Sequence, residues 1–132
     1  MPETYRVLGL GHVSIVVSDM DRSVAFYRDR LGFRVEWVVK NDRDYWTFMS
    51  NNSCIIELMQ GDAASRRDGH VNHLSLLVGD VREAKKELEE NGVVFEEESK
   101  DLILDAELYP RGELFAMFRG PDGERLQIEQ IL

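Results

Sequence analysis

Four residues of this 132-residue chain are of the types that bind metal ions and move protons: His12, Glu57, His73 and Glu129. Imidazole nitrogens and carboxylate oxygens together suit a borderline divalent cation such as Zn, Ni or Fe. Both glutamates lie within apolar stretches, where a carboxylate without a partner is costly to bury. Four such ligands leave one or two coordination positions for water or substrate, as a catalytic metal ion requires. We therefore expect these side chains to form a metal site.

The four residues fall at matching places of an internal repeat. Residues 12–20 align with residues 73–81 at an offset of 73 − 12 = 61, and each copy reads as a histidine, an apolar strand and a helix-capping aspartate. The helix that follows each strand ends at a glycine, Gly32 or Gly92, because glycine readily takes the conformation that terminates a helix. The repeat therefore places His12 and His73 at the starts of equivalent strands.

Three further strands follow each predicted helix. They are expected at residues 33–39, 45–50 and 53–59 in the first copy, and at residues 93–97, 113–119 and 125–131 in the second. The two copies end alike, which matches Glu57 with Glu129 at an offset of 129 − 57 = 72. The excess over the first offset, 72 − 61 = 11 residues, predicts an extended loop at residues 99–112. Each half is then βαβββ, and the fold class is α+β.

Chain length and repeat together predict one structural domain made of two modules. A chain of 132 residues is close to the usual size of a single domain. The first module is expected at residues 5–60 and the second at residues 70–132, with a linker at residues 60–69. His70 has no counterpart in the first copy and would face the opposite side of a strand from His73, so we interpret it as a linker residue.

Composition excludes several classes of partner. The chain has 16 Lys and Arg against 25 Asp and Glu, a net charge of −9, whereas a nucleic-acid or anionic-membrane binder needs a basic face. Cys54 is the single cysteine, so no intrachain disulfide can form, and we expect it to be a small buried strand residue. We see no signal peptide or long apolar run in the sequence, and we expect a cytoplasmic protein.

The ordered set of motifs resembles the vicinal oxygen chelate superfamily, which includes glyoxalase I, methylmalonyl-CoA epimerase, extradiol dioxygenases, and fosfomycin- and bleomycin-resistance proteins. The resemblance rests on residues 11–14, 26–33, 56–58, 72–75 and 121–129 and covers nearly the whole chain. It implies an open, metal-centred, barrel-like sheet built from two βαβββ modules, with His12, Glu57, His73 and Glu129 as ligands. It also implies a homodimer.

With all four ligands present, the chain most resembles glyoxalase I, a lyase that moves a proton next to a carbonyl. One divalent ion (Ni, Zn, Co, Mn or Fe) would stabilise the enediolate, and Glu57 or Glu129 would act as the base, with no organic cofactor. The substrate would be a small α-oxygenated carbonyl compound or its thiol adduct. Val16 and Gly61 stand where bacterial glyoxalase I usually has a basic residue and an asparagine that hold glutathione, so the use of glutathione is left open.

Two alternatives come from other functional classes. An Fe(II) or Mn(II) extradiol dioxygenase would use His12, His73 and Glu129, a two-histidine, one-carboxylate set. A non-catalytic small-molecule-binding protein of the resistance kind would usually lack the metal ligands that this chain retains.

Side chains around the ligands are expected to form the substrate pocket. A tight turn at residues 51–52 pairs Trp46 with Glu57 on one sheet face, with Phe48 next along it. In the second module, the family resemblance suggests a bulge near Pro121 that would turn Met117 and Arg119 inward. An inward Arg119 would bind a substrate carboxylate or phosphate.

Overall fold

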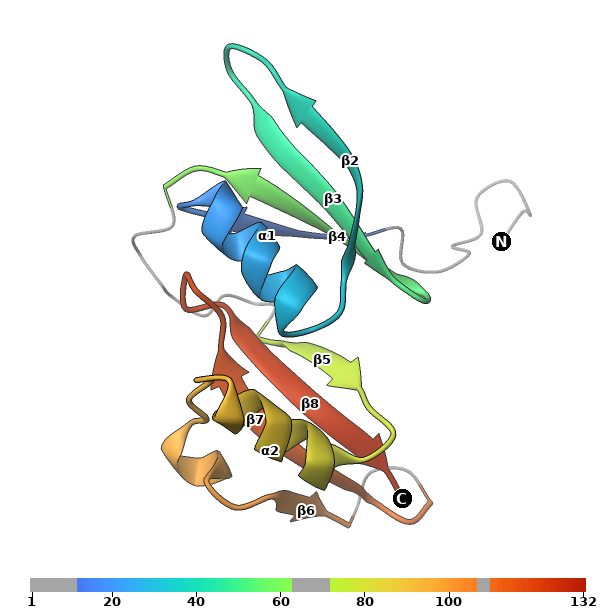
Figure 1. Cartoon of the computed structure of the whole chain (residues 1–132). Coiled ribbons are helices and arrows are strands. Elements are labelled where there is room, and N and C mark those ends of the chain that lie inside the picture. The colour runs from blue at the N-terminus through green and yellow to red at the C-terminus, as the bar shows by residue number, and fades with distance from the viewer. Residues whose placement is uncertain (1–11, 63–71, 107–109) are drawn as a thin grey trace, which may run out of the picture. The chain divides into compact units, whose positions relative to one another are not determined.

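The computed structural model describes residues 12–62, 72–106 and 110–132, and His70 lies outside these ranges (Figure 1). The chain divides into two compact units, residues 1–61 and 62–132. Each unit contains one four-stranded mixed sheet with a helix, in the order strand, helix and three strands. The α+β class and the paired βαβββ modules are therefore confirmed. The expected module bounds and the single structural domain stay predictions.

In the first unit one helix covers one face of the sheet. Its elements are β1 (Val13–Val17), α1 (Met20–Asp29), β2 (Arg34–Lys40), β3 (Tyr45–Asn51) and β4 (Cys54–Gln60). The strand order is β1-β4-β3-β2, with β1 parallel to β4 and the other pairs antiparallel. The buried core contains Tyr27 from α1 with Met49, Ile56 and Leu58 from the sheet. Because side chains alternate along a strand, Phe48 and Glu57 lie on the face away from this core.

The second unit has the same plan with one addition. Its elements are β5 (Leu74–Leu77), α2 (Val81–Glu90), the 3₁₀ helix η2 (Glu97–Ser99), β6 (Ile103–Asp105), β7 (Glu113–Arg119) and β8 (Arg125–Ile131). The strand order β5-β8-β7-β6 repeats that of the first unit, with β5 parallel to β8. Phe118, Leu126 and Ile128 form its core with Val81 and Leu88 from α2. Residues 125, 127 and 129 therefore face away from that core.

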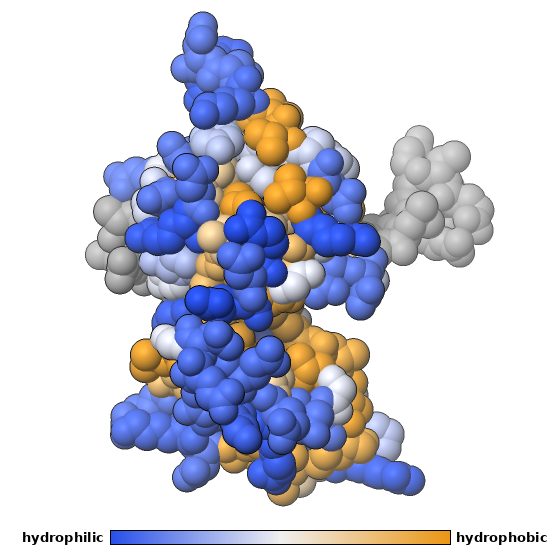
Figure 2. Space-filling model, in the orientation of Figure 1, coloured by the Kyte–Doolittle hydropathy of each residue, from blue (hydrophilic) through white to orange (hydrophobic). Residues whose placement is uncertain are grey.

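Both helices begin and end as the repeat predicts. The Asp19 carboxylate accepts a hydrogen bond from the backbone N–H of Arg22 at 3.1 Å, and Asp80 does the same from Arg82 and Glu83. After the helices, Gly32 and Gly92 have φ of 74° and 87°, the left-handed conformation that glycine adopts without strain. In the described part of the chain no helix is long and apolar enough to cross a membrane. The outer face of α2 is hydrophilic (Figure 2).

The strand predicted at residues 93–97 is wrong. Phe95 makes only an isolated bridge to Phe118, and η2 follows at once. The edge strand is instead β6, inside the segment predicted as an extended loop. A hydrogen bond explains the interruption: the backbone N–H of Met117 donates to the hydroxyl of Ser99 at 2.9 Å, so at this point β7 bonds to a side chain and not to a neighbouring backbone carbonyl.

Candidate functional site

The first unit holds a histidine and a carboxylate side by side on its open sheet face. His12 Nε2 lies 3.5 Å from Glu57 Oε1, and the hydroxyl of Ser14 donates to the same oxygen at 2.5 Å. Ser14 can do this because parallel β1 and β4 place it directly beside Glu57. Glu57 is only 9% exposed, whereas His12 is exposed. The hydroxyl holds this carboxylate oxygen in place beside the imidazole.

Aromatic side chains flank this pair, but in a different register from the predicted one. Phe48, not Trp46, lies opposite Glu57, and its ring meets the His12 ring edge-on at 5.8 Å between centroids. The predicted pairing was two residues out because the turn lies at residues 52–53. Asn52 takes a φ of 47° there, which asparagine tolerates better than most residues.

Trp37 was not predicted from the sequence. A register shift in β2 between Val35 and Trp37 sets Trp37 opposite Phe48, and the two rings stack with centroids 4.9 Å apart. Bulges of this kind redirect side chains, and the pattern of β2 gives no local sign of one. Trp37 is 51% exposed, so its ring is a second aromatic surface beside the histidine and carboxylate.

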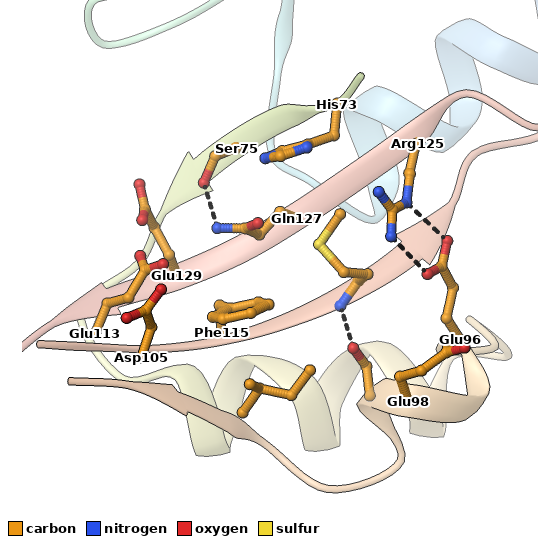
Figure 3. A pocket seen from close by; sticks show the side chains of 13 residues that line it. His73, Ser75, Glu96, Glu98, Asp105, Glu113, Phe115, Arg125, Gln127 and Glu129 are labelled. Atoms are coloured by element: carbon orange, nitrogen blue, oxygen red, sulfur yellow. Dashed lines mark hydrogen bonds and ion pairs between the residues drawn. The ribbon is translucent and has the colours of Figure 1, made fainter. Parts of the chain in front are cut away.

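The second unit contains a pocket of about 590 Å³ on the corresponding sheet face (Figure 3). Its lining combines one histidine, one arginine, five acidic side chains and a small apolar set. These residues are His73, Ser75, Glu96, Glu98, Ser99, Ile103, Asp105, Glu113, Phe115, Met117, Arg125, Gln127 and Glu129. Two of the predicted ligands and the predicted pocket residue Met117 therefore lie together here.

The strand register changes which residue matches Glu57. Ser75 lies beside Gln127, as Ser14 lies beside Glu57 in the first unit, and Gln127 Nε2 donates to the Ser75 hydroxyl at 3.2 Å. The equivalent of Glu57 is therefore Gln127, at an offset of 127 − 57 = 70. The predicted match to Glu129 was wrong, because similar sequences at the strand ends suggested an alignment that the pairing of β5 with β8 does not follow.

Glu129 lines the pocket although it is not the equivalent of Glu57. It lies two residues further along β8 on the same face, opposite Phe115 on β7. The matched positions of the two units are thus two histidines, the carboxylate of Glu57 and the amide of Gln127. Metal ligation by Glu129 stays a prediction that no longer has support from the repeat.

A hydrogen-bond chain orients His73. Its Nδ1 lies 2.8 Å from Asn72 Oδ1, and Arg125 Nη1 donates to the same oxygen at 2.6 Å. Arginine can only donate, so this Asn72 atom is an acceptor and His73 Nδ1 must carry the hydrogen. The lone pair then lies on Nε2, which is the arrangement that a metal-ligating histidine needs. Asn72 and Arg125 are 53 residues apart, so no local pattern indicates this contact.

Arg125 is itself held by a bidentate ion pair. Its Nε and Nη2 donate to the two oxygens of Glu96, each at 3.1 Å. The hydrogen bond from Arg125 is the main cause that lowers the pKa of Glu96; burial opposes it, and the charges of Arg125 and Arg119 lower the pKa further. This pocket end therefore carries a fixed carboxylate–guanidinium pair.

Arg119 does not line the pocket. Its Nε donates to Glu96 at 3.0 Å and its Nη1 to the carbonyl of Gly123 at 3.1 Å. The predicted bulge is wrong for these strands, because β7 and β8 pair in continuous register from Glu113 to Arg119 and Pro121 lies in the connecting loop. Arg119 thus supports the Glu96 carboxylate, and binding of a substrate anion by Arg119 stays a prediction.

The opposite end of the pocket is acidic. The carboxyl groups of Asp105, Glu113 and Glu129 lie together there, from three neighbouring strands (Figure 3). Glu113 is 3% exposed, and its Oε2 has no hydrogen-bond partner among the described residues. A hydrogen bond with Glu129 raises the pKa of Glu113 to about 7, with further contributions from burial and from the charges of Glu129 and Asp105. An acid at the start of β7, followed by five apolar residues, was the signal that could have identified Glu113.

Each unit taken by itself presents donor types that suit a divalent metal ion. Among the described residues no group of three or more His, Cys, Asp or Glu side chains lies close enough to hold an ion. Each unit instead presents one imidazole nitrogen and one oxygen donor: His12 with Glu57, and His73 with Gln127. Nitrogen and oxygen donors of this kind suit Zn, Ni, Mn and Fe.

Two βαβββ modules, each with a histidine leading into its first strand and an oxygen donor on its last, define the class of protein. Residues 9–128 match the family described as the glyoxalase, bleomycin resistance protein and dioxygenase superfamily. The chain belongs to this superfamily.

Three proteins illustrate what the chain is similar to. It is 30% identical over 125 residues to the uncharacterized protein YwkD of Bacillus subtilis, covering 89% of this chain and 92% of that one. Its fold matches a glyoxalase family protein from Enterococcus faecalis with a TM-score of 0.76 and 24% identity, covering 92% and 97% of the two chains. It also matches the fosfomycin resistance protein FosX from Listeria monocytogenes, in complex with Mn(II) and sulfate, with a TM-score of 0.75, 16% identity and coverages of 96% and 95%.

Proposed function

We propose that this protein is a metal-dependent lyase or isomerase of the glyoxalase type, acting on a small α-oxygenated carbonyl compound or its thiol adduct. The observation that carries the proposal is the equivalence of the two half-sets, in which a serine hydroxyl fixes Glu57 in one module and Gln127 in the other. The proposed ligands of one divalent ion are His12, Glu57, His73 and Gln127. The homodimer and the cytoplasmic location expected from the sequence belong to the same proposal.

The chain's own residues would hold the metal ligands in position and move the substrate proton. When bound, a divalent ion would stabilise negative charge on two adjacent substrate oxygens. Ser14 holds one oxygen of Glu57, and Asn72 holds His73 with its Nε2 lone pair available. Glu129 is proposed as the base that takes a proton from the substrate carbon, because its carboxylate lines the pocket beside Gln127 without occupying the matched ligand position.

Metal analysis of the purified chain tests the proposal. We expect about one divalent ion per chain and a higher Tm on addition of Mn, Ni, Zn or Co, because an ion that binds only the folded state stabilises it. His12→Ala and His73→Ala should each abolish the rise in Tm. Absence of bound metal together with an unchanged Tm would overturn the proposal.

Two substitutions on β8 separate the alternatives for the fourth ligand. Gln127→Glu should tighten metal binding by about tenfold or more, because a carboxylate replaces a neutral amide at the ligand position. Glu129→Gln is the matched control, and it should leave metal affinity within about threefold while lowering kcat. If Glu129→Gln instead removes the metal, the assignment of Gln127 is refuted.

One observation favours a second candidate, an Fe(II) or Mn(II) extradiol dioxygenase. The corrected register leaves two histidines and one carboxylate, Glu57, at the matched positions, together with the amide of Gln127. A two-histidine, one-carboxylate set is the usual ligand set of non-haem Fe(II) oxygenases. Oxygen consumption that depends on Fe(II) and a catechol, and that fails with Zn or Ni, would favour this candidate over the lyase.

A further inference from the structure

The hydrogen-bond chain behind His73 ends in an arginine that is held in place. Arg125 Nη1 donates to Asn72 Oδ1 at 2.6 Å, and the same oxygen lies 2.8 Å from His73 Nδ1. Arg125 also donates from Nε and Nη2 to the two oxygens of Glu96, each at 3.1 Å (Figure 3). A guanidinium bonded to a carboxylate through two parallel N–H groups has a well-defined orientation. Arg125 therefore presents an N–H to Asn72 from a fixed position.

Asn72 by itself does not determine the tautomer of His73. An asparagine amide carries an acceptor oxygen and a donor nitrogen, and a half turn of the amide exchanges the two. With the oxygen toward His73, Nδ1 carries the hydrogen, whereas with the NH₂ group toward His73, Nδ1 must accept and the hydrogen moves to Nε2. Because a guanidinium can only donate, Arg125 requires the amide oxygen on its own side and excludes the second orientation. The tautomer therefore depends on Arg125, which acts through Asn72.

The first module carries other residue types at the matching positions. In the sequence, Gly11 and not an asparagine precedes His12. The strand register sets Ile55 on β4 where β8 has Arg125, at the offset of 125 − 55 = 70 that also relates the last strands of the two modules. Glycine and isoleucine have no polar side-chain group, and the described neighbour of His12 is instead the carboxylate of Glu57, at 3.5 Å. The two histidines are thus held by different means.

We propose that Arg125 is a positioning residue, which fixes the amide of Asn72 and thereby keeps the hydrogen of His73 on Nδ1. A free histidine side chain prefers its hydrogen on Nε2, so this chain of hydrogen bonds reverses the ordinary preference. The lone pair is then on Nε2 before any ligand binds, and no proton has to change place. The inference rests on the proposed function only for the claim that His73 binds a metal ion, because the tautomer is a property of the metal-free chain.

The test is nitrogen NMR of the imidazole side chains in metal-free, full-length protein at about pH 8, where an unperturbed imidazole is neutral. A ring nitrogen that carries a hydrogen and one that carries a lone pair differ widely in chemical shift, so the spectrum gives the tautomer of each histidine. We expect the hydrogen of His73 on Nδ1 in the wild type. Arg125→Met should move it toward Nε2, because the amide of Asn72 can then turn. His12 is the internal control, and its spectrum should not change.

Two further variants separate positioning from a general effect of charge. Arg119→Met removes an equal charge that is bonded to the same Glu96 carboxylate, and it should leave the tautomer of His73 unchanged. Asn72→Asp, introduced together with Arg125→Met, should restore the hydrogen to Nδ1, because a carboxylate presents only acceptors in any orientation. Circular dichroism confirms that each variant is folded before its spectrum is recorded.

A titration with Mn²⁺ gives the second readout. Arg125→Met should bind Mn²⁺ about tenfold more weakly than Arg119→Met, since both lose one positive charge and only the first loses the contact that orients His73. An unchanged tautomer in Arg125→Met, an equal change in Arg119→Met, or equal Mn²⁺ affinities of the two variants would each overturn the inference. The expected tautomers in a chain that binds no metal would refute the proposed function and still support the action of Arg125 on His73.

Discussion

Replacing Glu113 by Gln should make the fold more stable at alkaline pH and leave it nearly unchanged at acidic pH. Glu113 is buried at 3% exposure against Glu129 and Asp105, and these neighbours and burial raise the pKa of Glu113 from 4.5 to about 7. Between about pH 4.5 and pH 7, Glu113 therefore holds a proton in the folded chain that it releases on unfolding. Gln resembles the protonated side chain, because its amide nitrogen can donate to Glu129 where the acid's O–H would.

The sign and the size follow from linkage. Because the folded pKa of Glu113 lies above its unfolded value, this carboxyl group favours the folded state below about pH 4.5, and that contribution is lost as pH rises through about 7. The pKa difference is 7 − 4.5 = 2.5, which at about 1.4 kcal/mol per unit sets a ceiling of about 3 kcal/mol. Glu129 shares the proton, so about 1–2 kcal/mol is the expected difference.

The assay is urea unfolding of wild type and Glu113→Gln at about pH 5 and about pH 8, read by circular dichroism. The difference in unfolding free energy between the two proteins should be small at the lower pH and favour the variant at the higher one. Glu98→Gln, which removes an exposed carboxylate from the same pocket, should show no such growth with pH. A difference that is constant with pH, or that falls as pH rises, would refute the reasoning.

Two further substitutions test how the edge of the second module is held. Gly112→Ala should lower the free energy of unfolding in urea by about 2–3 kcal/mol, because φ at Gly112 is 88° and the added Cβ would lie 2.6 Å from a backbone carbonyl oxygen. The control is Gly92→Ala, at a similar φ but in open space, which should lower it by only about 1 kcal/mol. Lys85→Met should cost about 1–2 kcal/mol and speed amide exchange around η2, because the buried Lys85 ammonium donates to the carbonyl of Lys100 at 2.8 Å; Lys86→Met on the exposed face should cost less than about 0.5 kcal/mol.

The fold could be predicted because its signals are local and occur twice. An aspartate before each helix and a glycine after it determine the helix ends through contacts within four residues. Alternating apolar residues mark the strands, and the repeat predicts that the two halves share one topology. The strand predicted at residues 93–97 does not form, because the side chain of Ser99, and not a backbone carbonyl, accepts the N–H of Met117. When a side chain replaces a backbone carbonyl as hydrogen-bond acceptor, the alternation of apolar and polar residues in the sequence does not change, so the pattern cannot reveal it.

The candidate site could be predicted only in part because register is a long-range property. The types and approximate places of the two histidines and Glu57 follow from the repeat, but a two-residue shift separates Gln127 from Glu129 and both lie on the same face of β8. Sequence similarity at the strand end cannot distinguish them. The pairing of β5 with β8 can, since it sets Ser75 beside Gln127.

The two modules have the same order of strands and helix but carry different side chains on the open face of the sheet. This difference indicates that they have different roles. In the first, the carboxylate of Glu57 lies beside His12 and stacked aromatic rings, so the negative charge is next to the imidazole. In the second, a neutral amide replaces that carboxylate, and the acidic groups lie further along the strands around Glu113. A neutral amide at this position would bind a metal ion more weakly than a carboxylate does. Among the proposed ligands, the first module therefore contributes the carboxylate and the second a neutral amide.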